Sequence, residues 1–282
     1  MGSSWEVGRE SAASPLLPAP LAAAGHGAVP HVTILMATRN GAAFLEPQLE
    51  SIAAQSHANW SLRIGDDGSD DGTRKIIAAF RARHPTRDIR LLEGPRRGAA
   101  ANFLALLGHG PPPRAYVAFS DQDDIWLAHK LRRALGQMAA YPTQRPLLYG
   151  SRTIIADDHG RDRRMSRHHR RRLGFGNALV QNVIAGNTAM LNPAAARLMH
   201  RASAGITVPF HDWWLYLMVS AAGGPCCSTH ARGCSTASTA TTCSAPASRR
   251  ATRSGVCGGS RHGILRAGMR PMSPRSTPMR RC

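Results

Sequence analysis

The chain has 282 residues, 43% of them hydrophobic, which is enough for one large α/β domain with a packed core. Thirty-six Lys and Arg against 17 Asp and Glu give a formal net charge of +19, a balance often found in nucleic-acid-binding proteins. More than half of that charge lies in residues 226–282, which hold ten Arg and no acidic residue. The charge is therefore a property of the tail, and we expect no nucleic-acid partner.

The first 30 residues are rich in Ala, Pro and Gly, with Pro15, Pro18 and Pro20 among them. They lack the basic start and apolar core of a secretory signal, so they are predicted to be a flexible leader, residues 1–30. No apolar run in the sequence is long enough to span a bilayer. We expect a cytoplasmic protein.

Strands and helices are predicted to alternate from residue 31 to about residue 140. Short, β-branched apolar runs predict strands, and apolar residues spaced three or four apart predict the helices between them. The predicted strands are 31–37, 61–65, 89–92 and 116–119. The apolar residues of the predicted helices lie within 45–52, 76–80, 102–107 and 127–138. This alternation indicates βαβ units and a mainly parallel sheet.

Two acidic segments follow predicted strands. Asp66 and Asp67 close the second strand, and Asp121 and Asp123 follow the fourth. Right-handed crossovers bring both segments to the carboxyl edge of the sheet, where ligands bind in open α/β folds. Carboxylates crowded there repel one another unless a cation lies between them. The pattern predicts a metal-bound nucleotide.

The pattern loosens after residue 140. Short strands are predicted at 147–149, 154–155 and 187–191, and helices at 193–200 and 213–222, the last one buried. A basic stretch runs from Arg161 to Arg172; it is either a solvated loop or a contact for anionic lipid headgroups. Residues 225–282 hold all six Cys and no aromatic residue, so this tail is predicted not to fold by itself.

Several ordered segments resemble the family-2 glycosyltransferases of bacteria, in particular the branch that includes rhamnosyltransferases of cell-surface polysaccharide synthesis. These are VTILMATRNG at 32–41, the run ending GDDGSDDGT at 73, AAANF at 99–103, FSDQDDIWLAHK at 119–130, QNVIAGNTAMLN at 181–192 and HDWW at 211–214. The resemblance covers residues 31–224. It implies a GT-A-type, Rossmann-like α/β fold: a mixed, mostly parallel sheet flanked by helices.

The resemblance also implies an activity, the inverting transfer of a sugar such as rhamnose from a dTDP- or UDP-sugar donor. The acceptor is a cell-surface polysaccharide or a lipid-linked saccharide, which would bring the protein to the inner face of the cell membrane. By this resemblance the nucleotide pocket includes Thr38, Arg39, Asn40, Asp66 and Asp67, one of the two Asp accepting from the pyrimidine N3–H.

The remaining site residues come from the same resemblance. Asp121 and Asp123 look like a DxD motif that holds Mg²⁺ or Mn²⁺ against the sugar diphosphate, and Asp212 looks like the catalytic base. Several of these acidic residues also have a purely structural interpretation. Asp212, which precedes an aromatic helix, is also a good N-cap. Asp124 is more typical of a helix cap than of a ligand, and the Asp70–Asp71 pair is typical of a turn and helix cap. Trp213 and Trp214 either line the acceptor site or pack in the core.

The chain departs from this branch after the HDWW helix, where family members have a strand and a Tyr-Arg-Gln-His segment. Shifting the reading frame by one base allows Thr236, Ala237, Ser238 and Thr239 to encode that segment. A frameshift near residues 223–225 would explain the cysteines, the missing acids and the missing aromatics together. The alternatives are a natural basic tail, or a degenerate nucleotide-binding relic without transferase activity.

Overall fold

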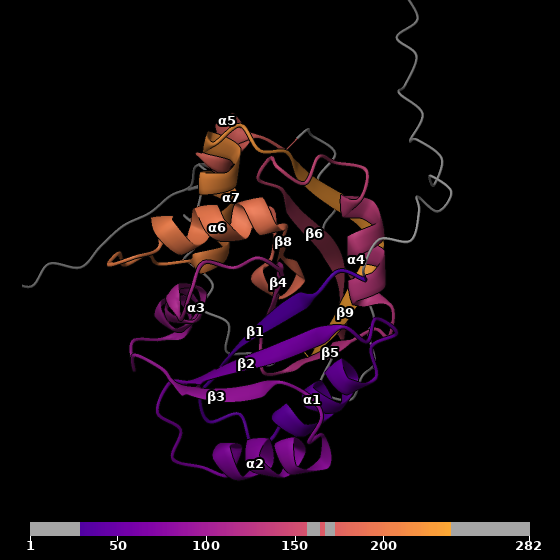
Figure 1. Cartoon of the computed structure of the whole chain (residues 1–282), viewed down its shortest axis with the longest axis vertical. Coiled ribbons are helices and arrows are strands. Elements are labelled where there is room, and N and C mark those ends of the chain that lie inside the picture. Colours follow the sequence, from indigo (N-terminus) through magenta and orange to yellow (C-terminus); the bar gives the residue numbers. More distant parts are fainter. Residues whose placement is uncertain (1–28, 157–163, 167–172, 238–282) are drawn as a thin grey trace, which may run out of the picture. The chain divides into compact units, whose positions relative to one another are not determined.

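The structure, a computed structural model, describes residues 29–156, 164–166 and 173–237, with the backbone alone at 156 and 229–237. Its centre is a nine-stranded sheet with the order β3-β2-β1-β4-β8-β6-β9-β5, and β7 pairs with β6 off this path (Figure 1). The strands are β1 (Val32–Thr38), β2 (Trp60–Asp66), β3 (Ile89–Glu93), β4 (Tyr116–Ser120), β5 (Asp124–Trp126), β6 (Leu148–Ala156), β7 (Arg164–Met165), β8 (Met190–Leu191) and β9 (Cys226–Ala237).

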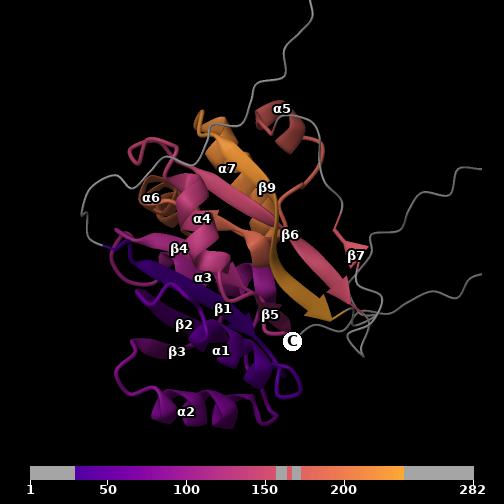
Figure 2. The same cartoon turned by 90° about the vertical axis from the view of Figure 1, so that its right-hand side faces the viewer.

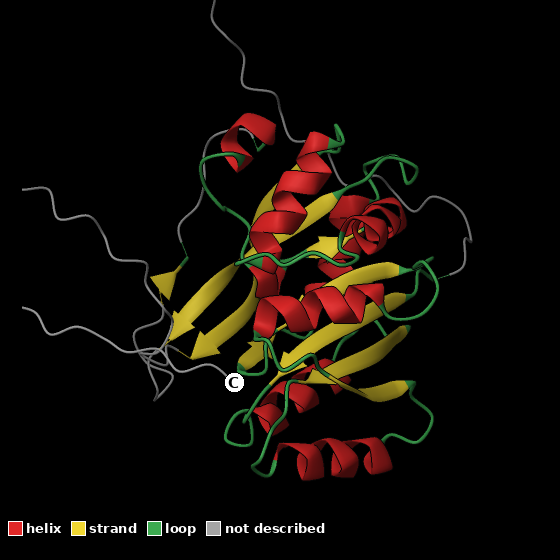
Figure 3. Ribbon diagram, turned by 90° about the vertical axis from the view of Figure 1, so that its left-hand side faces the viewer, coloured by secondary structure: helices red, strands yellow, loops and turns green. Residues whose placement is uncertain are grey.

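Helices cover both faces of this sheet. One face carries α1 (Leu45–Ala53), α2 (Thr73–Arg83) and α4 (Lys130–Met138), as Figure 2 shows. The other face carries α3 (Ala99–Gly108), α6 (Pro193–Ala202) and α7 (His211–Ala221), which lie in front of the strands in Figure 3. A one-turn helix, α5 (Phe175–Ala178), precedes a 3-10 turn, η1 (Gly186–Thr188). The mixed α/β fold predicted from the sequence is confirmed.

The four predicted strands of the first half form the parallel part of the sheet. β1 lies between β2 and β4, with Thr38 opposite Asp66 and Met36 opposite Ser120. Every residue of β1 is buried, as expected for a parallel strand with both faces covered. The register places both acidic segments at the carboxyl edge, in agreement with the prediction.

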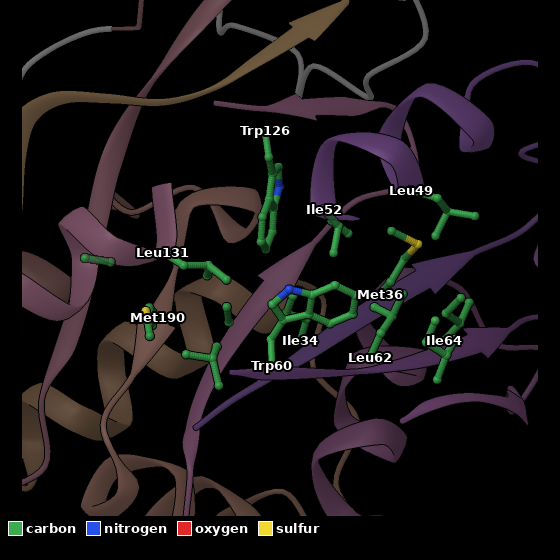
Figure 4. Packing of buried hydrophobic residues seen from close by; sticks show 14 of the residues in the cluster. Ile34, Met36, Leu49, Ile52, Trp60, Leu62, Ile64, Trp126, Leu131 and Met190 are labelled. Carbon is green, nitrogen blue, oxygen red and sulfur yellow. The ribbon is translucent and has the colours of Figure 1, made fainter. Parts of the chain in front are cut away.

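Two hydrophobic clusters, one on each face, hold these layers together. The α1 stripe of Leu45, Leu49 and Ile52 is fully buried against β1 and β2. Figure 4 shows Trp60 and Trp126 pointing into the same cluster. Each such side chain contributes roughly 1.5–3 kcal/mol by leaving water. Trp126 is thus a core residue.

The second half differs from its predicted elements. The apolar pieces at 147–149 and 154–155 belong largely to one long strand, β6, and the predicted strand at 187–191 begins as the η1 turn. β6 and β8 are antiparallel to each other, and β8 is antiparallel to β4, so the sheet is mixed.

The sheet also continues past the expected boundary at residue 224. β9 pairs parallel to β6 and antiparallel to β5. Pairing of this kind uses backbone N–H and C=O groups, so it does not depend on an apolar side-chain pattern, and no local signal predicts it. Residues 226–237 of the expected disordered or frameshifted tail thus form a strand, and the origin of their sequence stays a prediction.

Three expectations fall largely or wholly outside the described residues. Positions 1–28 of the leader, positions 238–282 of the tail and most of the basic stretch at 161–172 are not described. Of that stretch, Arg164–Met165 forms β7. Within the described segments, no helix is long and apolar enough to cross a membrane.

Candidate active site

The turn after β1 is fixed by side chains of the loop after β2. Asn40 has a left-handed backbone (φ 48°), a conformation that Asn tolerates better than most residues. Its N–H donates to Ser69 Oγ at 2.9 Å, and its Oδ1 accepts from the Asp70 N–H at 3.0 Å. Thr38 is buried at the strand end, whereas Arg39 and Asn40 are exposed. Of the three expected nucleotide-pocket residues in this turn, two are therefore exposed to solvent.

Asp66 is buried at the end of β2, with 1% of its surface exposed. Its Oδ1 accepts from the Ser69 N–H (3.2 Å) and hydroxyl (2.5 Å), and its Oδ2 accepts from Arg74 Nε at 2.5 Å. Arg74 also pairs with Glu93 at the end of β3. Asp66 thus ties the end of β2 to the start of α2.

Asp67 is 3% exposed and holds the loop between β3 and α3. Its Oδ1 accepts from the Arg96 N–H at 2.6 Å, and its Oδ2 accepts from the Gly98 N–H at 2.7 Å. Both donors have left-handed backbones (φ 57° and 88°). The first acidic segment is at the expected place, but its two strand-end carboxylates already bind protein donors.

Asp71 acts as expected of a turn and cap residue. Its Oδ1 accepts from the Thr73 N–H at 2.9 Å at the start of α2, and its Oδ2 accepts from the Ala42 N–H at 3.1 Å. The hydrogen bonds from Thr73, in particular, lower the pKa of Asp71 below its ordinary value. The N-cap residue of α2 is Gly72, and the side-chain bond at the helix start comes from Asp71 of the expected pair.

The second acidic segment has a different environment. Loss of water around Asp121, together with the charges of Asp124, Asp123 and Asp212, raises the pKa of Asp121 to about 8, and Lys130 opposes this. Burial also raises the pKa of Asp123. Carboxylates that repel one another to this degree take up either a proton or a cation. Asp212, about 90 residues further along the chain, belongs to the same charged cluster.

Gln122, between the two Asp of the DxD, joins the two acidic regions through the β1 turn. Its Oε1 accepts from Thr38 Oγ1 at 2.7 Å and from the Arg39 N–H at 3.0 Å. A Cβ on Gly41 would lie 2.4 Å from the same oxygen, so a larger residue there would displace the Gln122 side chain. Gln122 was not among the site residues predicted from the sequence. Its position between Asp121 and Asp123 was the signal that could have identified it.

Asp212 lies in the first turn of α7. Its Oδ1 accepts from the Trp213 N–H at 2.8 Å, and its Oδ2 accepts from the Gly186 N–H at 3.1 Å. The N-cap residue of α7 is Phe210, so the interpretation of Asp212 as an N-cap is wrong, although Asp212 still binds at the helix start. Its charge also acts on Asp121, and its role as the base stays a prediction.

The aromatic residues around Asp212 are packed. Trp213 Nε1 donates to the Ala178 carbonyl at 2.6 Å and so ties α7 to α5. Trp214 packs against the second hydrophobic cluster. His211 stacks on Phe103 with ring centroids 4.1 Å apart, and burial lowers the pKa of His211 to about 4. His211 is therefore neutral at physiological pH.

The donor set at the DxD fits a divalent cation that is shared with a ligand. Among the residues described, no group of three His, Cys, Asp or Glu could hold a metal ion unaided. Mg²⁺ sites in nucleotide enzymes commonly use one or two carboxylates and take further oxygens from substrate phosphates. Asp121 and Asp123 supply two carboxylates whose pKa values are raised, mainly by burial, and a cation would favour their charged forms.

Residues 33–204, more than half of the chain, match the family described as Glycosyl transferase family 2. The chain belongs to this family. Among curated relatives it is similar to the dTDP-rhamnosyl transferase RfbG of Shigella flexneri, with 38% identity over 103 residues, 36% of this chain and 35% of that protein.

Another relative is the E. coli UDP-Glc:alpha-D-GlcNAc-diphosphoundecaprenol beta-1,3-glucosyltransferase WfgD. The identity is 31% over 125 residues, which are 44% of this chain and 46% of that protein. The matched regions thus span less than half the length of either relative.

Solved structures share the fold. The mannosyltransferase PcManGT of Pyrobaculum calidifontis, in complex with GDP-Man and Mn²⁺, aligns with a TM-score of 0.55 at 21% identity, over 74% of this chain and 57% of that one. TarS 1-349 of S. aureus aligns with a TM-score of 0.54 at 14% identity, over 73% and 60% of the two chains. These likenesses agree with the expected GT-A fold.

Proposed function

We propose that the protein transfers a sugar from a nucleotide-sugar donor to a saccharide hydroxyl, with inversion and with a divalent metal ion. The observation that carries this proposal is the grouping of Asp123 and Asp212 around Asp121, since the charges of both residues act on Asp121. A metal–diphosphate site and a base are thereby brought together at the carboxyl edge of the sheet.

The two roles follow from the chemistry of glycosyl transfer. Cleavage of the glycosyl–phosphate bond leaves a nucleoside diphosphate with growing negative charge, which a divalent cation held by Asp121 and Asp123 stabilises as a Lewis acid. The acceptor hydroxyl is a weak nucleophile. Asp212 takes its proton as the new bond forms, and a single displacement from the face opposite the leaving group inverts the anomeric centre.

We place the nucleotide against the β1 turn and the first acidic segment. Arg39 and Asn40 are exposed there, whereas Asp66 and Asp67 are buried and bonded to protein donors. A direct bond from Asp67 to a pyrimidine N3–H therefore requires the loop at Arg96 to move. Without that movement, Asp66 and Asp67 shape the pocket by holding its loops.

Rhamnose from dTDP-rhamnose is the donor sugar we propose first, because RfbG is a dTDP-rhamnosyl transferase by name. WfgD is named for an acceptor on diphosphoundecaprenol, and this supports a lipid-linked saccharide acceptor. The basic stretch at residues 161–172 is the proposed contact with anionic membrane lipids.

Donor turnover with Mn²⁺ or Mg²⁺ tests the site. Asp123→Ala removes one of the two metal carboxylates, and we expect at least a hundredfold loss of kcat because charge stabilisation at the leaving group is lost. The measurement is release of nucleoside diphosphate from dTDP- and UDP-sugars in the presence of saccharide acceptors. The exposed Asp88→Ala, away from the DxD, serves as the control and keeps full turnover. Undiminished turnover in Asp123→Ala would contradict the assignment.

A second candidate is a relic that binds nucleotide but transfers nothing. The acid-free, aromatic-free sequence of residues 226–282 favours it, because β9 pairs with β5, the strand that directly follows Asp121 and Asp123. Genomic DNA read across codons 218–282 separates the two cases. A single-base lesion identifies an altered tail, and the chain with the frame restored then regains transfer that the present chain lacks.

A further inference from the structure

The η1 turn, Gly186–Thr188, touches both halves of the proposed active site. The Gly186 N–H donates to Asp212 Oδ2 at 3.1 Å. The side chain of the next residue, Asn187, donates from Nδ2 to Asp124 Oδ1 at 2.9 Å. Two successive residues of one turn therefore hold the proposed base and the residue that directly follows the DxD.

A buried cation anchors the same turn from a third direction. Lys130 Nζ donates to the Asn187 carbonyl at 2.6 Å, and its ammonium group lies 3.7 Å from the centroid of the Trp126 ring. Lys130 is 6% exposed, Asn187 8% and Asp124 1%. Buried charged and polar groups are costly unless they are paired, so each of these bonds restricts where the others can lie.

The turn itself has little freedom. Thr188 donates from its N–H and its hydroxyl to the Ala185 carbonyl, at 2.9 and 2.8 Å. A Cβ on Gly186 would lie 2.6 Å from His211 Nε2 and 3.4 Å from Asp212 Cβ. The backbone approaches α7 closely here, and only glycine fits without displacing His211 or its helix.

We propose that Asn187 is a positioning residue that couples the metal-binding DxD to the catalytic base. Its amide fixes Asp124, which directly follows Asp123, and its backbone continues into the Gly186 N–H that orients Asp212. The inference rests on the proposed function, which assigns the metal site and the base. The contacts that carry it do not depend on which reaction takes place. Loss of an outer-shell partner of a metal site costs about 10–100-fold in metal affinity or activity.

The test compares Asn187→Ala with the wild-type full chain by Mn²⁺ titration, with free Mn²⁺ followed by electron paramagnetic resonance in saturating UDP and again in saturating dTDP. We expect the apparent Kd for Mn²⁺ to rise at least tenfold. In turnover, kcat should fall more than the donor KM rises, because Asp212 loses its orientation as well. Asn187→Asp keeps the shape but sets a carboxylate against Asp124, so its Mn²⁺ Kd should rise at least as much.

Asn192→Ala is the matched control, because Asn192 is another buried Asn in the same segment and serves only the scaffold. Its Oδ1 accepts from the Ala195 and Leu147 N–H groups at 2.9 and 3.0 Å, and its Nδ2 donates to the Arg145 carbonyl at 2.8 Å. We expect a lower Tm for Asn192→Ala and an unchanged Mn²⁺ Kd in its folded fraction.

The outcomes separate the two proposals. A Kd for Asn187→Ala within twofold of wild type, or an equal rise in Asn192→Ala, overturns the coupling. A wild-type chain that binds Mn²⁺ with nucleotide but transfers no sugar overturns the proposed function alone, and the titration still decides the role of Asn187. A wild-type chain that neither binds nor transfers overturns both.

Discussion

The two acidic segments end strands on either side of β1, and they use the same residue type in opposite ways. In the first segment, Asp66 and Asp67 accept from Ser69, Arg74 and two backbone N–H groups. In the second, burial and the charges of Asp124, Asp123 and Asp212 raise the pKa of Asp121 to about 8. An acidic cluster at a strand end can thus be a scaffold that binds protein donors, or a site where burial and neighbouring negative charge disfavour the bare carboxylate.

The largest effect on stability is expected from the first segment. Asp67→Ala removes the carboxylate that accepts hydrogen bonds from the backbone N–H groups of Arg96 and Gly98. Hydrogen bonds to a charged group contribute about 1.5–3 kcal/mol each. We expect a loss of about 3 kcal/mol in the free energy of unfolding, measured by urea titration. Asp88→Ala, which removes an exposed ion pair with Arg90, is the control and should change nothing measurable. Equal free energies of unfolding for the two variants would contradict the scaffold role of Asp67.

The second segment should respond in the opposite direction. Asp121 has a pKa of about 8 in the fold against 3.8 ordinarily, so the folded protein binds its proton more tightly than the unfolded chain. In metal-free protein, the free energy of unfolding therefore falls as pH rises from about 4 towards 8.

Asp121→Asn removes this penalty. At pH 8 in chelator we expect a gain of at least about 1 kcal/mol in the free energy of unfolding, which shrinks at pH 5, where Asp121 is already protonated. Thermal unfolding between pH 5 and pH 9 provides the measurement. A variant that is less stable than wild type at pH 8 would show that Asp121 has stabilising partners like those of Asp66.

The smallest effect is expected at Asp71, an exposed member of the first segment. Its lowered pKa means that its contribution to stability is present above the ordinary pKa of 3.8 and is lost as pH falls through the folded value. Asp71→Ala should lower the Tm slightly at pH 7 and not at all at pH 2. A Tm difference that persists in acid would assign the effect to the turn itself and not to its charge.

The first half was predictable because its signals are local. The apolar runs of β1 to β4, the Leu45, Leu49 and Ile52 stripe, and acids at strand ends can be read within short windows. The site residues Asp121, Asp123 and Asp212 came from the family resemblance, and the structure brings them together without testing their roles.

The parts of the fold and of the candidate site that could not be predicted depend on contacts between residues far apart in the sequence. β5 has only three residues, and it pairs with residues 234–236 of a segment without an apolar pattern. The bonds of Gln122 to Thr38 and of Asn187 to Asp124 join positions 84 and 63 residues apart. Apart from the position of Gln122 inside the DxD, nothing in the local sequence around these amides distinguishes them from solvent-exposed ones.

The place of β9 has a consequence for the order of events during synthesis. β5 carries Asp124, and within the described chain its ladder partner is β9, the last described strand. The parallel strands around β1 can form while the ribosome is still at work, but the pairing of β5, directly after Asp121 and Asp123, waits until β9 has been made. A premature stop or a cleavage before residue 226 would thus spare the parallel part of the sheet and leave β5 without β9.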